Sequence, residues 1–240
     1  MISHLPAIRA YRRAAHLMVL HRAETPLARS VTKFGGLPYL LQDEQWPICS
    51  RCRRPMSFVF QANFGDIPGT FRLGDYDLLT FYYCLNCCPR SSEEAKGYRL
   101  QLYRTAPGDA LQLAHFALRR DEVSEPRECA IAFRLIEDLP PAETVVTILG
   151  TDERVLREYE RYVERLRGGN LCASKIGGYP YWIQVEPTLR CRCGVAMRFL
   201  AQIESEIEAN LLWGDNGLLY LFHCPQLCSA ESVGFLIQSE

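Results

Sequence analysis

The sequence predicts an α+β fold that is rich in β-structure, with one cysteine-bearing module duplicated inside an extended antiparallel sheet flanked by a few helices. Short apolar and aromatic runs bounded by Gly, Pro, Asn and Asp favour strands over helices. Two stretches of the chain repeat the same motifs in the same order, and each contains two closely spaced groups of cysteines. We therefore expect residues 1–240 to form a single compact body made of two repeats.

The N-terminal part, residues 1–30, is predicted to be a helical segment, because residues 6–21 are rich in Ala, Leu and Arg. Its histidines, His4, His16 and His21, are expected on a solvated helix face. The segment is also basic, with Glu24 as the single acidic residue up to position 34. Packing on the body is the favoured interpretation, and contact with nucleic acid or an acidic protein surface is the alternative.

Two repeats are expected, at residues 31–105 and 171–240. Each opens with the motif Lys-[Phe/Ile]-Gly-Gly-x-Pro-Tyr, which begins at Lys33 and again 142 positions later at Lys175. Cys49 and Cys191 are also 142 positions apart. The glutamines Gln61 and Gln202 are 141 apart, and Cys84 and Cys224 are 140 apart. Two strands are predicted in each repeat, at residues 55–62 and 78–84 in the first and at residues 196–203 and 218–224 in the second.

Connecting strands and a helix are predicted for residues 106–170. The helix, at residues 151–167, has an apolar stripe, Thr151 as a possible N-cap and a Gly-Gly pair at its end. The strands expected in and around this region are Tyr98–Tyr103 and residues 111–118, 129–135 and 144–149.

The first repeat contains Cys49-x-x-Cys52 followed by Cys84-x-x-Cys87, a spacing typical of two zinc knuckles that supply the four thiolates of a structural site. Cys88 could replace Cys87 as the ligand, although the spacing favours Cys87. A redox Cys-x-x-Cys is the competing interpretation, and the lack of a flanking βαβ pattern argues against it.

The second repeat departs from the usual knuckle spacing. Its candidate ligands are Cys191 and Cys193, one residue apart, and Cys224 and Cys228, three residues apart. His223 adjoins this set but is expected to be an ordinary strand residue. A site closed by four thiolates has no open position for substrate or water, so the predicted zinc is structural.

The composition limits the function classes. The chain has 27 Lys and Arg against 28 Asp and Glu, giving a net charge of −1, which argues against a general nucleic-acid-binding protein. No stretch has the roughly 20 apolar residues of a membrane span or the pattern of a signal peptide, so we expect a cytoplasmic protein with no membrane partner. Dinucleotide, phosphate-loop, Gly-x-Ser-x-Gly and His-Glu-x-x-His motifs are all missing from the sequence, so a non-enzymatic protein is expected.

The ordered motifs together resemble the bacterial YwqG-like family and, more distantly, the eukaryotic programmed cell death protein 2. The resemblance covers residues 30–104 and 171–237, and residues 175–184 match best. It implies a non-enzymatic binding protein, because bacterial members are linked to immunity against secreted toxins and eukaryotic members to chaperoning a ribosomal protein.

We therefore expect an immunity protein that binds a cognate toxin domain. The alternatives are a chaperone for a ribosomal protein and an RNA-associated zinc protein. An acidic strip could meet a basic partner, and a solvated loop or a charged strand edge is favoured over a catalytic acid-base pair for its glutamates. The strip consists of Glu204, Glu206, Glu208 and Asp215.

Overall fold

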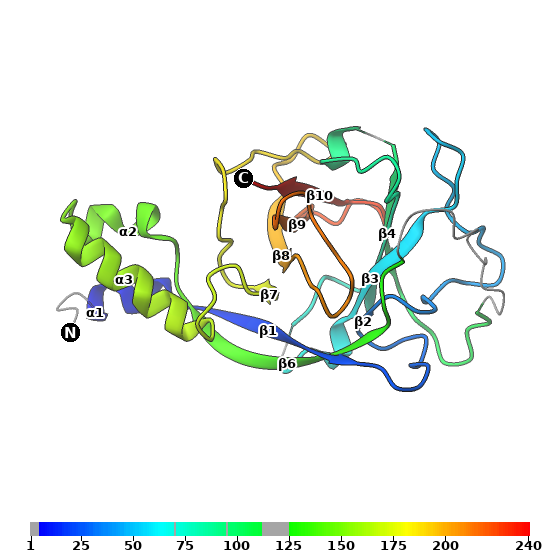
Figure 1. Ribbon diagram of the computed structural model, residues 1–240, viewed down its shortest axis with the longest axis horizontal. Coiled ribbons are helices and arrows are strands. Elements are labelled where there is room, and N and C mark those ends of the chain that lie inside the picture. The colour runs from blue at the N-terminus through cyan, green and yellow to red at the C-terminus, as the bar shows by residue number, and fades with distance from the viewer. Residues whose placement is uncertain (1–4, 70, 95, 112–124) are drawn as a thin grey trace.

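The computed structural model describes residues 5–69, 71–94, 96–111 and 125–240 (Figure 1). Within these residues the chain forms a 10-stranded antiparallel sheet in the order β10-β9-β8-β7-β1-β6-β2-β3-β4-β5. The strands are β1 Arg13–Arg22, β2 Lys33–Phe34, β3 Ser57–Asn63, β4 Leu78–Tyr83, β5 Tyr98–Tyr103, β6 Cys129–Asp138, β7 Lys175–Gly177, β8 Arg198–Glu204, β9 Leu218–His223 and β10 Val233–Gln238. The helices are α1 Leu5–Ile8, α2 Ala142–Leu149 and α3 Glu153–Leu166, with short 3-10 turns at Arg9–Tyr11, Phe64–Asp66 and Ser92–Glu94.

Two long strands, β1 and β6, form the middle of the sheet and pair along their whole length. Lys33 of β2 faces Ala130 of β6, and Lys175 of β7 faces Leu17 of β1. Val19 of β1 and Ala132 of β6 are partners in the central ladder. Leu17 lies two positions before Val19, and Ala130 lies two positions before Ala132. The two outer sets of strands, β2–β5 and β7–β10, therefore join the central ladder in matching positions.

The sheet curls until it is nearly closed, and its two end strands, β5 and β10, approach each other (Figure 1). The ring centroids of Tyr98 and Phe235 lie 4.9 Å apart across this seam. The concave side holds the main apolar core, to which both sets of strands contribute. The hairpin loops at residues 64–77 and 205–217 also fold into this core, through the buried residues Phe64, Ile67, Leu73, Tyr76, Ala209, Leu211 and Trp213.

Matching polar contacts occur in the two sets of strands. The side-chain oxygen of Gln61 accepts a hydrogen bond from the backbone of Tyr39, and that of Gln202 accepts one from Tyr181, each at 2.9 Å. The ladders β3–β4 and β8–β9 each contain one register shift, between Phe58 and Phe60 and between Phe199 and Ala201. A buried lysine begins each Gly-Gly motif and forms an ion pair with a carboxylate. Lys33 pairs with Glu128, just before β6, and Lys175 pairs with Asp138, the last residue of β6.

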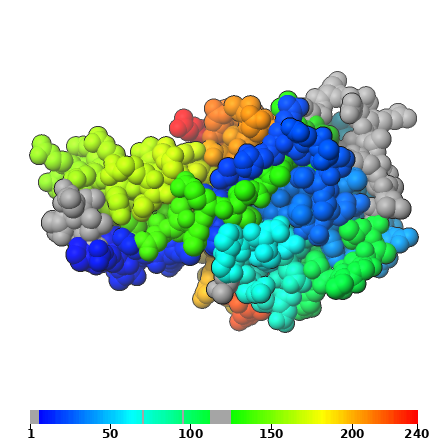
Figure 2. Space-filling view, turned by 90° about the horizontal axis from the view of Figure 1, so that it is seen from below, coloured from blue at the N-terminus to red at the C-terminus, as the bar shows by residue number. Residues whose placement is uncertain are grey.

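The helices form a second, smaller body at one end of the sheet (Figures 1 and 2). α2 and α3 lie in the connection between β6 and β7, and α1 precedes β1. Together they have their own apolar cluster, which includes Ile8, Val145, Tyr159 and Val163. The predicted helix at residues 151–167 corresponds to α3, whose N-cap is Asp152 and not Thr151. The Asp152 side chain accepts hydrogen bonds from two backbone N–H groups of the first turn.

Two predicted elements are wrong. The expected N-terminal helix is instead the four-residue α1 followed by strand β1, because backbone pairing with β6 and β7 on both sides outweighs the local helix propensity. His16 accordingly lies buried in the sheet, where its ring hydrogen-bonds the carbonyl of Pro68.

The expected strand at residues 144–149 is part of helix α2. Ala142, Val145 and Leu149 are all buried, and this spacing places them on one helical face against α3. Packing therefore overrides the β-propensity of the Val-Val-Thr-Ile run. The strand predicted at residues 111–118 lies outside the described residues apart from Leu111, which forms an isolated bridge with Leu41.

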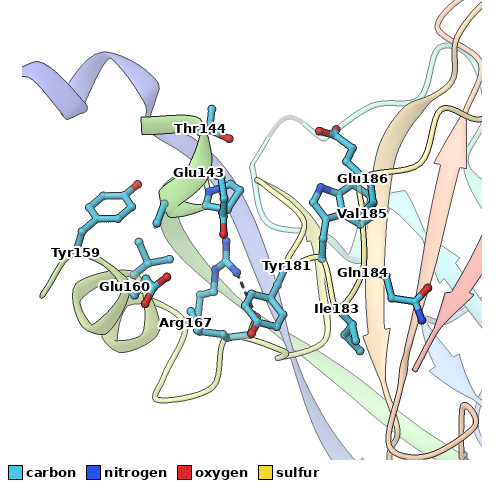
Figure 3. Close-up of a pocket in the computed structure, with 15 residues that line it drawn as sticks. Glu143, Thr144, Tyr159, Glu160, Arg167, Tyr181, Ile183, Gln184, Val185 and Glu186 are labelled. Carbon is cyan, nitrogen blue, oxygen red and sulfur yellow. Dashed lines mark hydrogen bonds between the residues drawn. The ribbon is translucent and has the colours of Figure 1, made fainter. Parts of the chain in front are cut away.

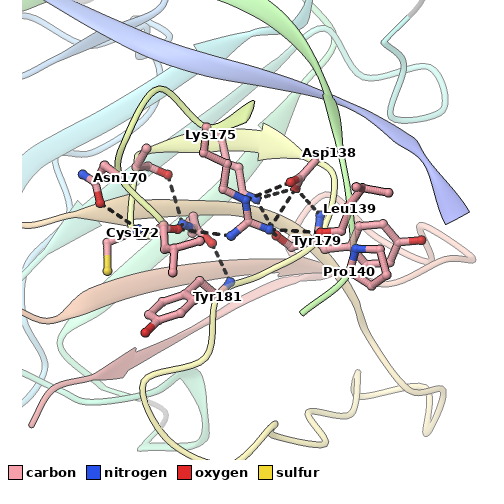
Figure 4. A network of polar contacts seen from close by, with 12 residues as sticks. Asp138, Leu139, Pro140, Asn170, Cys172, Lys175, Tyr179 and Tyr181 are labelled. Atoms are coloured by element: carbon pink, nitrogen blue, oxygen red, sulfur yellow. Dashed lines mark hydrogen bonds and ion pairs between the residues drawn. The ribbon is translucent and has the colours of Figure 1, made fainter. Parts of the chain in front are cut away.

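Asp138 joins the sheet to the helical body (Figure 4). Its buried carboxylate accepts hydrogen bonds from Arg167 Nε at 2.8 Å, from Lys175 Nζ and from the backbone N–H of Tyr179 at 2.9 Å. Burial alone raises the pKa of Asp138, but the charges of Lys175 and Arg167 outweigh this effect and hold the pKa below its ordinary value. A Cβ at Gly178 would overlap this carboxylate, so the second glycine of the motif is required for the contact.

Replacing Asp138 by Ala is expected to lower the free energy of unfolding by about 3–5 kcal/mol, because Arg167 and Lys175 would remain buried without a counter-charge. Urea denaturation of the two proteins measures the difference. Glu137→Ala is the matched control, since Glu137 is largely exposed in its ion pair with Arg12 and its loss should cost at most about 1 kcal/mol. Equal losses in the two variants would show that Asp138 does not have this role.

Candidate metal centres

The first cysteine cluster brings together Cys49, Cys52, Cys84 and Cys87, whose sulfur atoms all lie within 4.8 Å of one another. Cys49 and Cys87 are 3.8 Å apart and Cys52 and Cys84 are 3.5 Å apart. Cys49 and Cys52 lie on a turn shortly before β3, and Cys84 and Cys87 lie on a turn directly after β4. In the first turn the backbone N–H of Arg53 donates to the carbonyl of Cys49 at 2.8 Å.

The second cluster consists of Cys191, Cys193, Cys224 and Cys228, again with all sulfur atoms within 4.8 Å. Cys191 and Cys228 are 3.5 Å apart, and Cys193 and Cys224 are 3.6 Å apart. The shorter first loop is closed by Gly194, which has a positive φ of 85° and donates its N–H to the carbonyl of Cys191. The irregular spacing of the second repeat therefore still produces a complete set of four thiols.

These eight thiols fit a metal better than they fit disulfides. Their separations of 3.5–3.8 Å exceed the S–S bond length of about 2.05 Å. Zinc–sulfur bonds of about 2.3 Å in a tetrahedron place neighbouring sulfur atoms about 3.8 Å apart. Both clusters could therefore hold a metal ion with little rearrangement.

The turns also favour the thiolate form of two cysteines. Burial raises the pKa of Cys49, but backbone N–H groups of Cys52 and Arg51 outweigh this effect and bring the pKa to about 7. Burial likewise raises the pKa of Cys224, and the N–H of Gln226 with neighbouring thiols brings it to about 7. A thiolate is the form that binds a metal.

The two clusters differ in their surroundings. In the first, Cys52 and Cys87 are half-buried and pack against an apolar cluster that contains Trp46 and Tyr82. In the second, Cys193 and Cys228 are exposed. The second cluster is therefore more accessible to water and to competing ligands.

The remaining cysteines stand apart from these groups. Cys88 is exposed and its thiol donates to the carbonyl of Leu85, so Cys87 and not Cys88 completes the first cluster. Cys129 is buried in the main core, and Cys172 is half-buried. The ring of His223 hydrogen-bonds the backbone carbonyl of Cys224 and does not join the cluster.

The acidic strip is divided by its contacts. Glu204 accepts a hydrogen bond from Asn170 and Glu206 accepts one from Ser174, each at 2.8 Å. Burial raises the pKa of Glu206 to about 7, and the negative charges of Glu204 and Glu208 add to this effect against the Ser174 hydrogen bond. Glu208 and Asp215 are exposed.

Two exposed apolar side chains lie on the same loop as the strip, and sequence reasoning missed them. Ile207 is 87% exposed and Leu212 is 67% exposed. The signal in the sequence was weak, because an isoleucine between two glutamates can be buried or exposed, and only the structure shows which.

None of the helices in the described part of the chain is long and apolar enough to span a membrane.

Purified protein is expected to contain two equivalents of zinc, because each cluster supplies four thiols at the spacing of a tetrahedral site. Elemental analysis after purification without chelator measures the metal. Cys52→Ser should reduce the content by one equivalent and destabilise the first half, whereas the control Cys88→Ser should leave the content unchanged. A wild-type content below half an equivalent would contradict the assignment.

A chelator is expected to remove the metal of the second cluster before that of the first, because Cys193 and Cys228 are exposed. Metal release can be followed with a colorimetric zinc indicator while the chelator concentration is raised. In Cys193→Ser the early phase should be missing, and in Cys52→Ser the late phase should be missing. A single release phase shared by both clusters would refute this order.

Comparison with known proteins identifies a family. No curated protein matches the chain. A family model described as "Domain of unknown function (DUF1963)" matches residues 32–226. This range includes both Gly-Gly motifs and seven of the eight clustered cysteines, with Cys228 just beyond its end. Since the match extends over most of the sequence, the chain belongs to the DUF1963 family.

Proposed function

We propose that this chain is a non-enzymatic zinc protein of the cytoplasm that neutralises a cognate bacterial toxin by direct binding. The observation that carries this proposal is the loop at residues 205–217, which presents exposed apolar and acidic side chains on a firmly held backbone. The membership in DUF1963 is consistent with the YwqG-like resemblance, whose bacterial members are linked to immunity.

The loop is preorganised for binding. The backbones of Glu206 and Leu211 exchange two hydrogen bonds of 2.9 Å, and Trp213 anchors the loop in the main core. Asn210 donates a hydrogen bond to the carbonyl of Glu125. A held loop loses little conformational entropy on binding, so Ile207 and its neighbours can contribute most of their contact energy.

The chemistry of the loop fits a basic protein surface. Ile207 and Leu212 offer apolar contact area, and the exposed Glu208 and Asp215 supply negative charge. Exposed carboxylates speed the approach of a basic partner, while desolvated apolar residues supply most of the affinity. Glu204 and Glu206 instead hold the loop against residues 170–174, so they support the surface from behind.

The clusters support a structural role for zinc. Four thiolates fill a tetrahedral ion, which leaves no position for a substrate. We also propose that the two halves are copies of one module within a single body. The matching positions of β2 and β7 on the central ladder, and the matching glutamine and lysine contacts, support this interpretation.

Co-expression with the genes that neighbour it tests the function. A toxic neighbour should be neutralised by the wild type and should form a one-to-one complex with it. The double variants Ile207→Asp/Leu212→Asp and Glu208→Lys/Asp215→Lys should weaken that complex at least about 30-fold, which corresponds to about 2 kcal/mol. The measurement is the dissociation constant by calorimetry.

Leu135→Asp is the matched control, because Leu135 is an exposed apolar residue on β6. It should leave the affinity unchanged. If no neighbour is toxic and the protein instead captures a ribosomal protein, the chaperone alternative replaces the immunity proposal. Salt-dependent retention of RNA in place of either protein would favour the RNA-associated alternative.

A further inference from the structure

A pocket of about 640 Å³ lies between the helical body and the segment at residues 181–186 (Figure 3). One wall comes from α2 and α3 and includes Tyr159 and Val163. The other wall is the extended chain that follows the second Gly-Gly motif. In Figure 3 the ring of Tyr181 lies between these two walls. Pockets of this size are typical of ligand sites.

The extended wall is held in place from behind. The backbone N–H of Tyr181 donates to Gln202, that of Ile183 to the Tyr220 hydroxyl and that of Gln184 to Gln238. Trp182 also packs against the ring of Tyr220, with the ring centroids 4.7 Å apart. The half-buried Trp182 and Ile183 therefore face the pocket from a fixed backbone.

The pocket has a negative rim. Glu143 on α2, Glu160 on α3 and Glu186 on the extended wall line it, and all three are exposed. Arg167 also lines it, but its guanidinium is almost fully buried in its ion pair with Asp138. The charges left for a ligand to meet are therefore carboxylates.

The acidic surroundings reach Tyr181. Burial raises the pKa of its hydroxyl, and Cys172, Glu160 and Glu143 raise it further, while Arg167 acts in the opposite direction. Glu143 and Glu160, the two carboxylates that act on this hydroxyl, also line the pocket and would attract a cation.

Within the described residues, the first half is built differently at the corresponding positions. The connection from β1 to β2 contains no helix, whereas the connection from β6 to β7 contains α2 and α3. At the positions that align with Tyr181 and Trp182, Tyr39 and Leu40 are buried. The helices and the half-buried Trp182 that form the pocket walls are therefore not matched by the described residues of the first half.

We infer that this pocket binds a basic, extended polypeptide segment. A lysine or arginine side chain enters between Glu143 and Glu160 and lies over the Trp182 ring, where the cation is attracted by both. Val185, which is 88% exposed at the edge of the pocket, receives an apolar neighbour of that side chain. A small metabolite inside the pocket would leave Val185 uncovered, which favours a polypeptide. This site is separate from the loop at residues 205–217 and does not depend on a toxin being the partner.

Tryptophan fluorescence provides a direct test. Trp46 and Trp213 are buried, so the half-buried Trp182 is the tryptophan of the chain that acrylamide quenches best. The probes are the peptides acetyl-Lys-Leu-Arg-Leu-Lys-amide and acetyl-Glu-Leu-Glu-Leu-Glu-amide. The basic peptide should protect Trp182 from quenching in a saturable manner, and the acidic peptide should bind at least about tenfold more weakly. Trp182→Phe should abolish the protected signal.

The charge requirement has a matched control on α3. Glu143→Gln/Glu160→Gln should weaken the basic peptide at least about tenfold, with the dissociation constant measured by calorimetry. Glu153→Gln/Glu158→Gln removes the same charge from residues of α3 that do not line the pocket, and it should have little effect. Equal binding of the two peptides, no binding of either, or equal effects of the two double variants would overturn the inference. These outcomes leave the toxin complex untouched, so the two proposals fail independently.

Discussion

The buried carboxylate of Asp138 is the contact on which the arrangement of this molecule depends most. It is the common counter-charge of Lys175 in the second Gly-Gly motif and of Arg167 at the end of α3. Two cations buried without it would carry a large desolvation cost, so β6, β7 and the helical body are stable only in one relative position. The same contact also fixes the start of the extended segment after Gly178, because the N–H of Tyr179 donates to the Asp138 carboxylate.

Two other kinds of interaction contribute to the stability, and each acts in a different region of the molecule. Apolar side chains fill the concave side of the nearly closed sheet, where the strands are long enough to bury them. The cysteine turns lie at the ends of the β3–β4 and β8–β9 hairpins, outside that core. A metal held by the four thiolates would replace the apolar packing that such short turns cannot supply. The first cluster has additional support from Trp46 and Tyr82, and the exposed thiols of the second have less.

We propose that the two halves are copies of one module, and the binding features we propose occur in the second half. The loop at residues 205–217 places Ile207 and Leu212 in solvent, and the helical insertion creates a pocket beside Trp182. Both features rest on backbones held by buried groups, Trp213 in one and Gln202 in the other. This combination of a rigid scaffold and exposed apolar and acidic groups is what a binding protein requires.

Much of the scaffold could be read from the sequence because its signals are local. The spacing of the cysteines predicted both clusters of thiols, the apolar runs predicted β3, β4, β5, β8 and β9, and the helical stripe predicted α3. The Gly-Gly motifs marked a close approach whose purpose, room for a carboxylate beside a buried lysine, became visible only in three dimensions. Tertiary structure alone decided the rest. Residues 13–22 form a strand because β6 and β7 pair with both of their edges, and residues 142–149 form a helix because α3 covers one face. It also determined which acidic residues face solvent. Glu206 and Glu208 are two glutamates of one loop, but the fold brings Ser174 against Glu206 and leaves Glu208 exposed.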